Sequence, residues 1–99
     1  MMELNRILED TKLTVRLKGK LDSESAPELN AELASSLVGI TELVIDMTEL
    51  SYVSSAGLRV LLTARKQMNP RGKMVIRGAR ENIRDVLRFT GFTELMNVE

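Results

Sequence analysis

Two short segments of the sequence contain the side chains most suited to chemistry. The first is Leu21-Asp-Ser-Glu-Ser25, and the second is Ser51-Tyr-Val-Ser-Ser-Ala-Gly-Leu58. In the second, Ser54 and Ser55 directly precede an apolar helical pattern, where free backbone N–H groups and the positive end of the helix dipole favour negative charge. A serine there can carry a phosphate, which adds about −1.5 to −2 charges at neutral pH. On a docking surface, that charge is enough to prevent binding.

The same residues also have ordinary structural interpretations. Ser54 or Ser55 is expected to cap the helix, and Gly57 would permit close packing of the helix on a sheet. Asp22 is typical of a cap or turn. Asp46, which follows an apolar run, is expected at a strand end. From residue types alone, capping is the commoner role for such serines.

Apolar spacing predicts the elements of the first half of the chain. Leu4, Ile7 and Leu8 indicate a short first strand, and a turn at 9–11 leads into a second strand in which apolar and polar residues alternate from 12 to 18. Gly19 and Asp22-Ser23 are expected to close it. A helix should start at Ser25, with Glu28 as its capping-box partner, and end at Gly39. Its predicted apolar face consists of Ala26, Leu29, Leu33, Ala34 and Leu37.

The second half repeats a strand-helix pattern. The run Leu43–Ile45 suits a central strand covered on both faces. A helix opens at Ser54 or Ser55 and breaks at Asn69-Pro70-Arg71-Gly72. The next strand is expected at 74–76, and a third helix from Ala79 to Thr90-Gly91. The tail at 95–98 is either an edge strand or a helical turn.

The predicted order is therefore β-β-α-β-α-β-α, with or without a last strand. Two apolar strands joined by a helix imply parallel pairing and right-handed crossovers. The fold class is α/β, a small mixed sheet of four to five strands covered by helices. At 99 residues the chain has room for one core, so we expect a single domain over 1–99.

Composition excludes several functions. Cysteine and histidine are absent, so disulfides, thiolate zinc sites and imidazole bases are excluded, and we expect neither metal nor cofactor. The 14 basic residues balance 14 acidic ones, and no net field favours nucleic acid or an anionic membrane. No stretch approaches the roughly 18 to 20 apolar residues of a membrane span. We expect a cytoplasmic protein that is not an enzyme.

The stretch Leu43–Leu62, LVIDMTELSYVSSAGLRVLL, resembles the signature of STAS domains, the family of bacterial anti-sigma factor antagonists. Three more segments resemble the family pattern. Leu17–Asp22 is similar to its second strand and turn, Gly72–Ile76 to its fourth strand, and Val86–Phe92 to its third helix. The resemblance covers nearly the whole chain in order and implies the STAS fold.

The resemblance also implies a partner switch. The unphosphorylated antagonist binds an anti-sigma factor, often itself a serine kinase, and so releases the sigma factor. The kinase phosphorylates the serine at the start of the second helix, and a serine phosphatase reverses this. Alignment on Gly57 and Leu58 makes Ser55 the acceptor, with Ser54 as the alternative. The implied partner-binding residues are Asp22, Ser23, Tyr52, Ser54, Ser55, Ala56, Gly57, Leu58 and Arg59. The free protein is expected to be a monomer.

The sequence departs from the family pattern around the acceptor. Ser54 stands where an aspartate is usual, Ala56 where serine or threonine is common, and Arg59 where a small glycine is frequent. Ser55, Ser54 or neither could then be the acceptor. The alternative function is a STAS subunit of a larger assembly, such as a lipid-transport ATPase, without phosphorylation control.

Two further functions find little support. An enzyme with Ser55 as nucleophile would need a base, which Lys66 or Lys73 is poorly spaced to supply. A nucleotide-binding protein would need a glycine-rich phosphate loop, and neither Gly-Lys pair has the required spacing.

Overall fold

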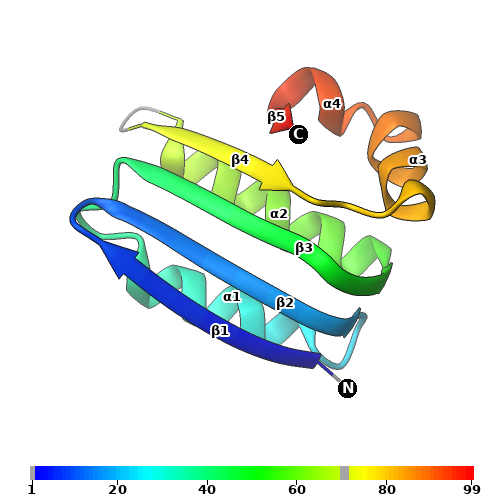
Figure 1. Cartoon of the computed structure of the whole chain (residues 1–99), viewed down its shortest axis with the longest axis horizontal. Helices are drawn as coiled ribbons and strands as arrows, with labels where there is room; N and C mark the ends of the chain where they lie inside the picture. Colours follow the sequence, from blue (N-terminus) through cyan, green and yellow to red (C-terminus); the bar gives the residue numbers. More distant parts are fainter. Residues whose placement is uncertain (1, 70–71) are drawn as a thin grey trace.

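The computed structural model describes residues 2–69 and 72–99. Within these ranges five strands and four helices follow one another, in the order shown in Figure 1. They are β1 Met2–Glu9, β2 Lys12–Leu21, α1 Ala26–Ser36, β3 Glu42–Val53, α2 Ser55–Met68, β4 Lys73–Arg77, α3 Glu81–Phe89, α4 Phe92–Leu95 and β5 Asn97–Val98. The predicted order is confirmed, and the tail contains both of the alternatives expected for it, a helical turn and then a short strand.

The sheet has the spatial order β1-β2-β3-β4-β5. β1 and β2 form an antiparallel hairpin, and the other neighbouring strands are parallel. Asp10 adopts a positive φ of 58° at the predicted hairpin turn, a conformation that aspartate tolerates better than most residues. The parallel pairs require crossovers, which α1, α2 and the pair α3 and α4 supply in turn. The mixed sheet that the sequence predicts is therefore confirmed.

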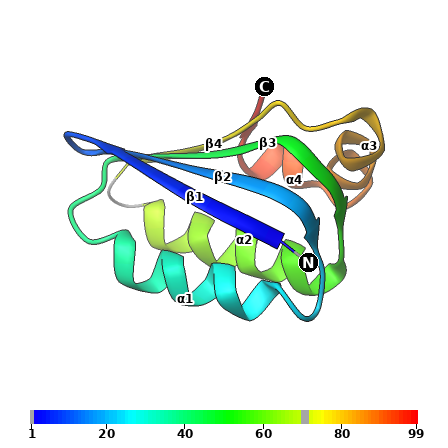
Figure 2. The ribbon, with the colours of Figure 1, turned by 60° about the horizontal axis from the view of Figure 1, so that its bottom comes forward.

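The core lies between the sheet and its helices. α1 and α2 run along one face of the sheet, as Figure 2 shows. Alternate residues of the inner strands point into this space because side chains alternate across a strand. One continuous cluster results, and its strand residues include Leu13, Val15, Leu17, Leu43, Ile45, Met47, Met74 and Ile76.

β3 is the central strand, as predicted, but helices cover only one of its faces. Leu43 and Ile45 belong to the core under the helices. Val44 alternates with these two residues and therefore points to the opposite face, and Figure 1 shows no helix in front of β1 to β4 among the described residues. Val44 is nevertheless only 3% exposed. Side chains of the adjoining strands shield it, because Thr14 and Val75 flank it in the register.

The prediction that the third strand ends at Asp46 is wrong. β3 continues to Val53, so the segment 51–53 that was expected in a loop belongs to the strand. The acid is tolerated inside the strand because Arg16 and Arg77 lie on the two neighbouring strands, each 3.6 Å from Asp46 Oδ2. β2 then pairs with β3 as far as Leu21 opposite Val53.

Several predicted boundaries shift. Gly19 lies inside β2, next to an irregularity in the β2–β3 register. α1 ends at Ser36, before the predicted Gly39, and Ala34 is exposed although it was expected on the apolar face. α3 begins at Glu81 and not at Ala79. α2 ends at Met68. Of its predicted break, Pro70 and Arg71 lie outside the described residues.

Candidate functional site

The ends of β2 and β3 meet at the start of α2. Leu21 lies opposite Val53 in the parallel register, and the Ser54 backbone N–H donates to Leu21 O at 2.8 Å. This contact joins the turn after β2 to the first turn of α2. The two segments that the sequence indicated are therefore neighbours at one edge of the sheet, where parallel strands usually place their functional loops.

Asp22 organises the turn between β2 and α1. Its Oδ1 accepts hydrogen bonds from the backbone N–H groups of Glu24 and Ser25, each at 3.0 Å. The Ser25 backbone N–H is the main cause of the lowered pKa of Asp22, and burial opposes it. The half-buried carboxylate is therefore ionised and held within its own turn.

The predicted capping box at the start of α1 is wrong. Ser25 is the residue before the helix, but its side chain makes no capping bond. The Ser25 Oγ instead lies 2.8 Å from Lys20 O and 3.1 Å from Asp22 Oδ1, and it accepts from the Asp22 backbone N–H. The hydroxyl faces back toward β2, and Asp22 Oδ1 accepts from the Ser25 N–H that the Glu28 side chain would use in a capping box.

Ser54 and Ser55 have different environments. Ser54 is the N-cap of α2, is half-buried, and its side chain accepts from the Gly57 N–H at 3.2 Å. Ser55 is the first residue of the helix and is exposed, and no hydrogen bond among residues 2–69 and 72–99 uses its hydroxyl. The first turn of α2 also contains no acidic residue. Ser55 therefore presents a free hydroxyl at the positive end of a helix.

Gly57 lets α2 approach the end of β2. A Cβ at this buried position would lie 2.6 Å from Leu21 Cγ and 3.1 Å from Leu21 O. The two neighbours of Gly57, Ala56 and Leu58, are half-buried and pack against the core, whereas Arg59 and Tyr52 are exposed. The predicted partner-binding residues thus divide into exposed side chains and residues that position them.

Comparison with known proteins identifies the family. The family model described as the STAS domain matches residues 3–99. The chain belongs to the STAS domain family. A Bordetella bronchiseptica protein named as a candidate anti-sigma factor antagonist, BtrV, is 35% identical over 99 residues, which cover 98% of this chain and 85% of that protein.

Solved structures share the STAS fold. A Mycobacterium paratuberculosis anti-sigma factor antagonist has a TM-score of 0.90 at 20% identity, with 99% of this chain and 85% of that one covered. The Bacillus cell fate determinant SpoIIAA in its phosphorylated form has a TM-score of 0.77 at 19% identity, with 100% and 91% covered. The predicted α/β STAS fold is confirmed.

A groove bordered by Ala56, the residue after Ser55, was not predicted from the sequence. It has a volume of about 370 Å³ and lies between α1 and α2, toward their N-terminal ends. Its lining residues are Ser23, Ala26, Pro27, Asn30, Ala56, Arg59, Val60 and Thr63. The spacing of positions 56, 59, 60 and 63 along α2 indicates one helix face. Only the three-dimensional packing shows that this face borders α1.

Other kinds of site find no support among the described residues. No group of three or more His, Cys, Asp or Glu side chains in this part of the chain could hold a metal ion. No helix within the described ranges is long and apolar enough to cross a membrane.

Asp46 is a structural acid of the STAS domain, and its charge should stabilise the fold. Burial raises the pKa of Asp46, but the hydrogen bonds from the Thr48 hydroxyl and N–H and the two arginines outweigh it, so the pKa lies below its ordinary value of 3.8. A carboxyl whose pKa is lower in the folded than in the unfolded protein stabilises the fold at pH values above its unfolded-state pKa. This stabilisation is lost as the pH falls through its folded-state pKa.

Asp46→Asn should therefore lower the free energy of unfolding by about 1 kcal/mol at neutral pH. The difference from the wild type should shrink as the pH falls below 3.8, where the unfolded wild type takes up the proton first. Urea unfolding of both proteins across this pH range measures it. A difference that stays constant over the whole range would contradict the role of the charge.

Proposed function

We propose that this STAS domain is an anti-sigma factor antagonist, and that phosphorylation of Ser55 switches off its binding to an anti-sigma factor. The observation that carries the proposal is the free, exposed hydroxyl of Ser55 beside the Asp22 turn and the groove between α1 and α2. The names of the relatives support the antagonist function. The structurally similar Bacillus protein SpoIIAA has a phosphorylated form, which supports control by a phosphate.

A phosphate on Ser55 would be compatible with the fold. The N–H groups of the first helical turn and the helix dipole favour an anion at this end of α2. The phosphate would instead weaken the complex with the partner, because a charge of about −1.5 to −2 would have to lose water at the docking surface. The domain would therefore fold with Ser55 either phosphorylated or unphosphorylated, whereas the complex would form only with unphosphorylated Ser55.

Ser55 is a better acceptor than Ser54. The Ser54 side chain caps the helix by accepting from the Gly57 N–H. A kinase could use the Ser54 hydroxyl only after this hydrogen bond had broken. Ser55 has no such bond among the described residues. The proposal therefore assigns phosphorylation to Ser55, by an anti-sigma factor with serine kinase activity, and removal of the phosphate to a serine phosphatase.

The remaining proposals follow from the same site. Residues 1–99 act as a single domain in the cytoplasm, without catalysis of its own and without nucleic acid as a partner. The docking surface consists of the exposed side chains of Ser23, Tyr52, Ser55 and Arg59, together with the groove. Asp22, Gly57 and Leu58 contribute by holding the two segments in place.

Intact-mass analysis tests the acceptor. The wild type, Ser55→Ala, Ser54→Ala and Ser23→Ala are each incubated with ATP and the kinase-like anti-sigma factor. We expect one added phosphate on every protein except Ser55→Ala, with Ser23→Ala as the matched exposed-serine control. Full labelling of Ser55→Ala would place the acceptor elsewhere. Formation of a complex without any labelling would instead favour an unregulated subunit of a larger assembly.

A further inference from the structure

The outer side of β1 is a free strand edge. β1 is the first strand of the sheet, so its outer N–H and C=O groups have no strand partner among the described residues. Its register with β2 is unbroken from Met2 to Glu9, and the segment contains no proline or bulge, two common protections of such edges, so its charged residues Glu3, Arg6 and Glu9 decide which registers are allowed. Ile7 is 41% exposed and Leu8 is 61% exposed.

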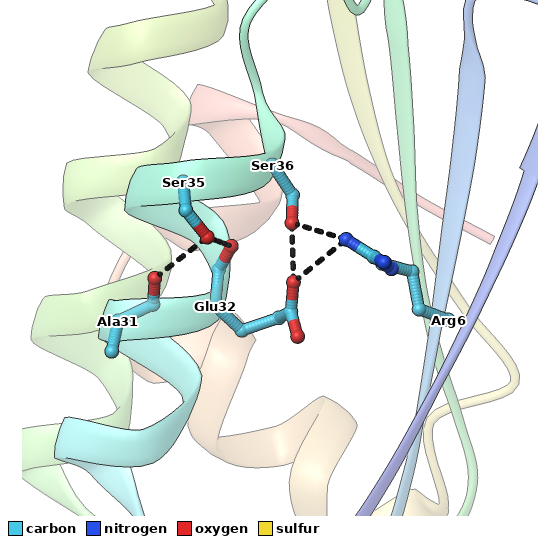
Figure 3. A network of polar contacts seen from close by, with 5 residues as sticks. All are labelled: Arg6, Ala31, Glu32, Ser35 and Ser36. Atoms are coloured by element: carbon cyan, nitrogen blue, oxygen red, sulfur yellow. Dashed lines mark hydrogen bonds and ion pairs between the residues drawn. The ribbon is translucent and has the colours of Figure 1, made fainter.

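Contacts with α1 hold this edge in place. Arg6 Nη1 lies 3.3 Å from Glu32 Oε2 and donates to Ser36 Oγ at 3.0 Å, and the Ser36 hydroxyl also donates to Glu32 (Figure 3). Next to this network a groove of about 440 Å³ is lined by Leu4, Glu28, Ala31 and Glu32. The edge is therefore ordered, and the groove beside it has room for side chains of an added strand.

We propose that β1 pairs antiparallel with β1 of a second copy of this chain, with Asn5 facing Asn5 at the two-fold axis. Facing residues of an antiparallel pair share one side of the sheet, so a symmetric pair must be centred on a residue. Centring on Arg6 would place Arg6 against Arg6 and Glu3 against Glu9, which are like charges. Centring on Leu4 or Ile7 would leave much of the strand unpaired.

The Asn5 register avoids facing like charges and joins one apolar pair. It places Met2 against Leu8 and Glu3 against Ile7, with no like charges facing one another. It also places Arg6 of the second copy opposite Leu4, beside the groove that contains Glu28 and Glu32. Glu28 is exposed and has no ion pair among the described residues, and Arg6 of the second copy would reach it by exchanging its contact with its own Glu32. This pairing departs from the expectation of a monomer when free.

Single cysteines test the register, because the chain has none of its own. Facing residues in this pair have Cα atoms about 4.5 to 5.5 Å apart, within the range of roughly 4.4 to 6.8 Å that disulfides span. We expect Asn5→Cys, oxidised with oxidised glutathione at high protein concentration, to become mostly disulfide-linked dimer on a non-reducing gel.

Ile7→Cys is the matched control on the same side of β1. In this register the two copies of residue 7 would lie about 13 Å apart, so this variant should stay mostly monomeric. Sedimentation of the uncrosslinked proteins should show a wild-type dimer that grows with concentration and that Leu8→Glu abolishes. Crosslinking of both cysteine variants alike, of neither, or of Ile7→Cys alone would overturn the proposal. A wild type that sediments as a monomer at every concentration would also overturn it.

Discussion

Ser55→Asp should weaken binding of the anti-sigma factor by about 30-fold or more. The added carboxylate would lose water at the docking surface without a partner, at a cost of about 2 kcal/mol or more. Each 1.4 kcal/mol changes affinity about tenfold. The fold itself should not suffer, because an acid in the first turn of α2 interacts favourably with the helix dipole. The loss should therefore appear in binding and not in thermal stability.

Calorimetric titration with the anti-sigma factor measures this effect. Ser55→Asn is the matched control, because it has the same size as the aspartate but carries no charge, and it should lose much less affinity. Ser55→Ala should bind like the wild type. Equal affinities for the wild type and Ser55→Asp would show that Ser55 lies outside the interface, whatever the result of the phosphorylation experiment.

Gly72→Ala should strongly destabilise the folded domain, although it adds only one methyl group. A Cβ at Gly72 would overlap the backbone oxygen of Thr41 and lie 2.6 Å from its carbonyl carbon. Backbone atoms cannot rotate away, and Thr41 O also accepts from the Lys73 N–H at 3.0 Å where β3 and β4 begin to pair. We expect a loss of about 3 kcal/mol or more in the free energy of unfolding.

In a domain of this size such a loss lowers Tm by more than about 10 °C. Gly91→Ala is an informative control, because Gly91 has a φ of 81° but a Cβ there would meet no described atom within 4 Å beyond its chain neighbours. Its strain alone should cost about 1 kcal/mol. Thermal unfolding of both variants distinguishes lack of space from strain. A Gly72→Ala protein at least as stable as Gly91→Ala would mean that β3 and β4 can separate at little cost.

The sequence predicted most of the fold because its signals are local. Alternating apolar residues marked β2, and the apolar run at 74–76 marked β4. Ser54 was one of two predicted caps for α2, and the structure confirms it. These signals depend on residues within a few positions of one another, which a single sequence contains in full.

Local signals failed where a distant partner decides the outcome. Asp46 looked like the end of a strand because an acid rarely continues a buried run. Arg16 and Arg77 come from different strands, and they make the acid acceptable in the middle of β3. Ser25 was predicted to form a capping box, but Asp22 accepts from the Ser25 N–H that the Glu28 side chain would have used.

Residue order alone was sufficient to predict the succession of elements, the parallel pairing of the inner strands and the presence of serines at the start of α2. Packing in three dimensions established that Leu21 and Ser54 meet, that the Ser54 hydroxyl is bonded while that of Ser55 is free, and that a groove lies beside them. This division arises because helix and strand signals act over a few residues. A site instead depends on which hydrogen bonds and close contacts remain once segments far apart in the chain have packed together.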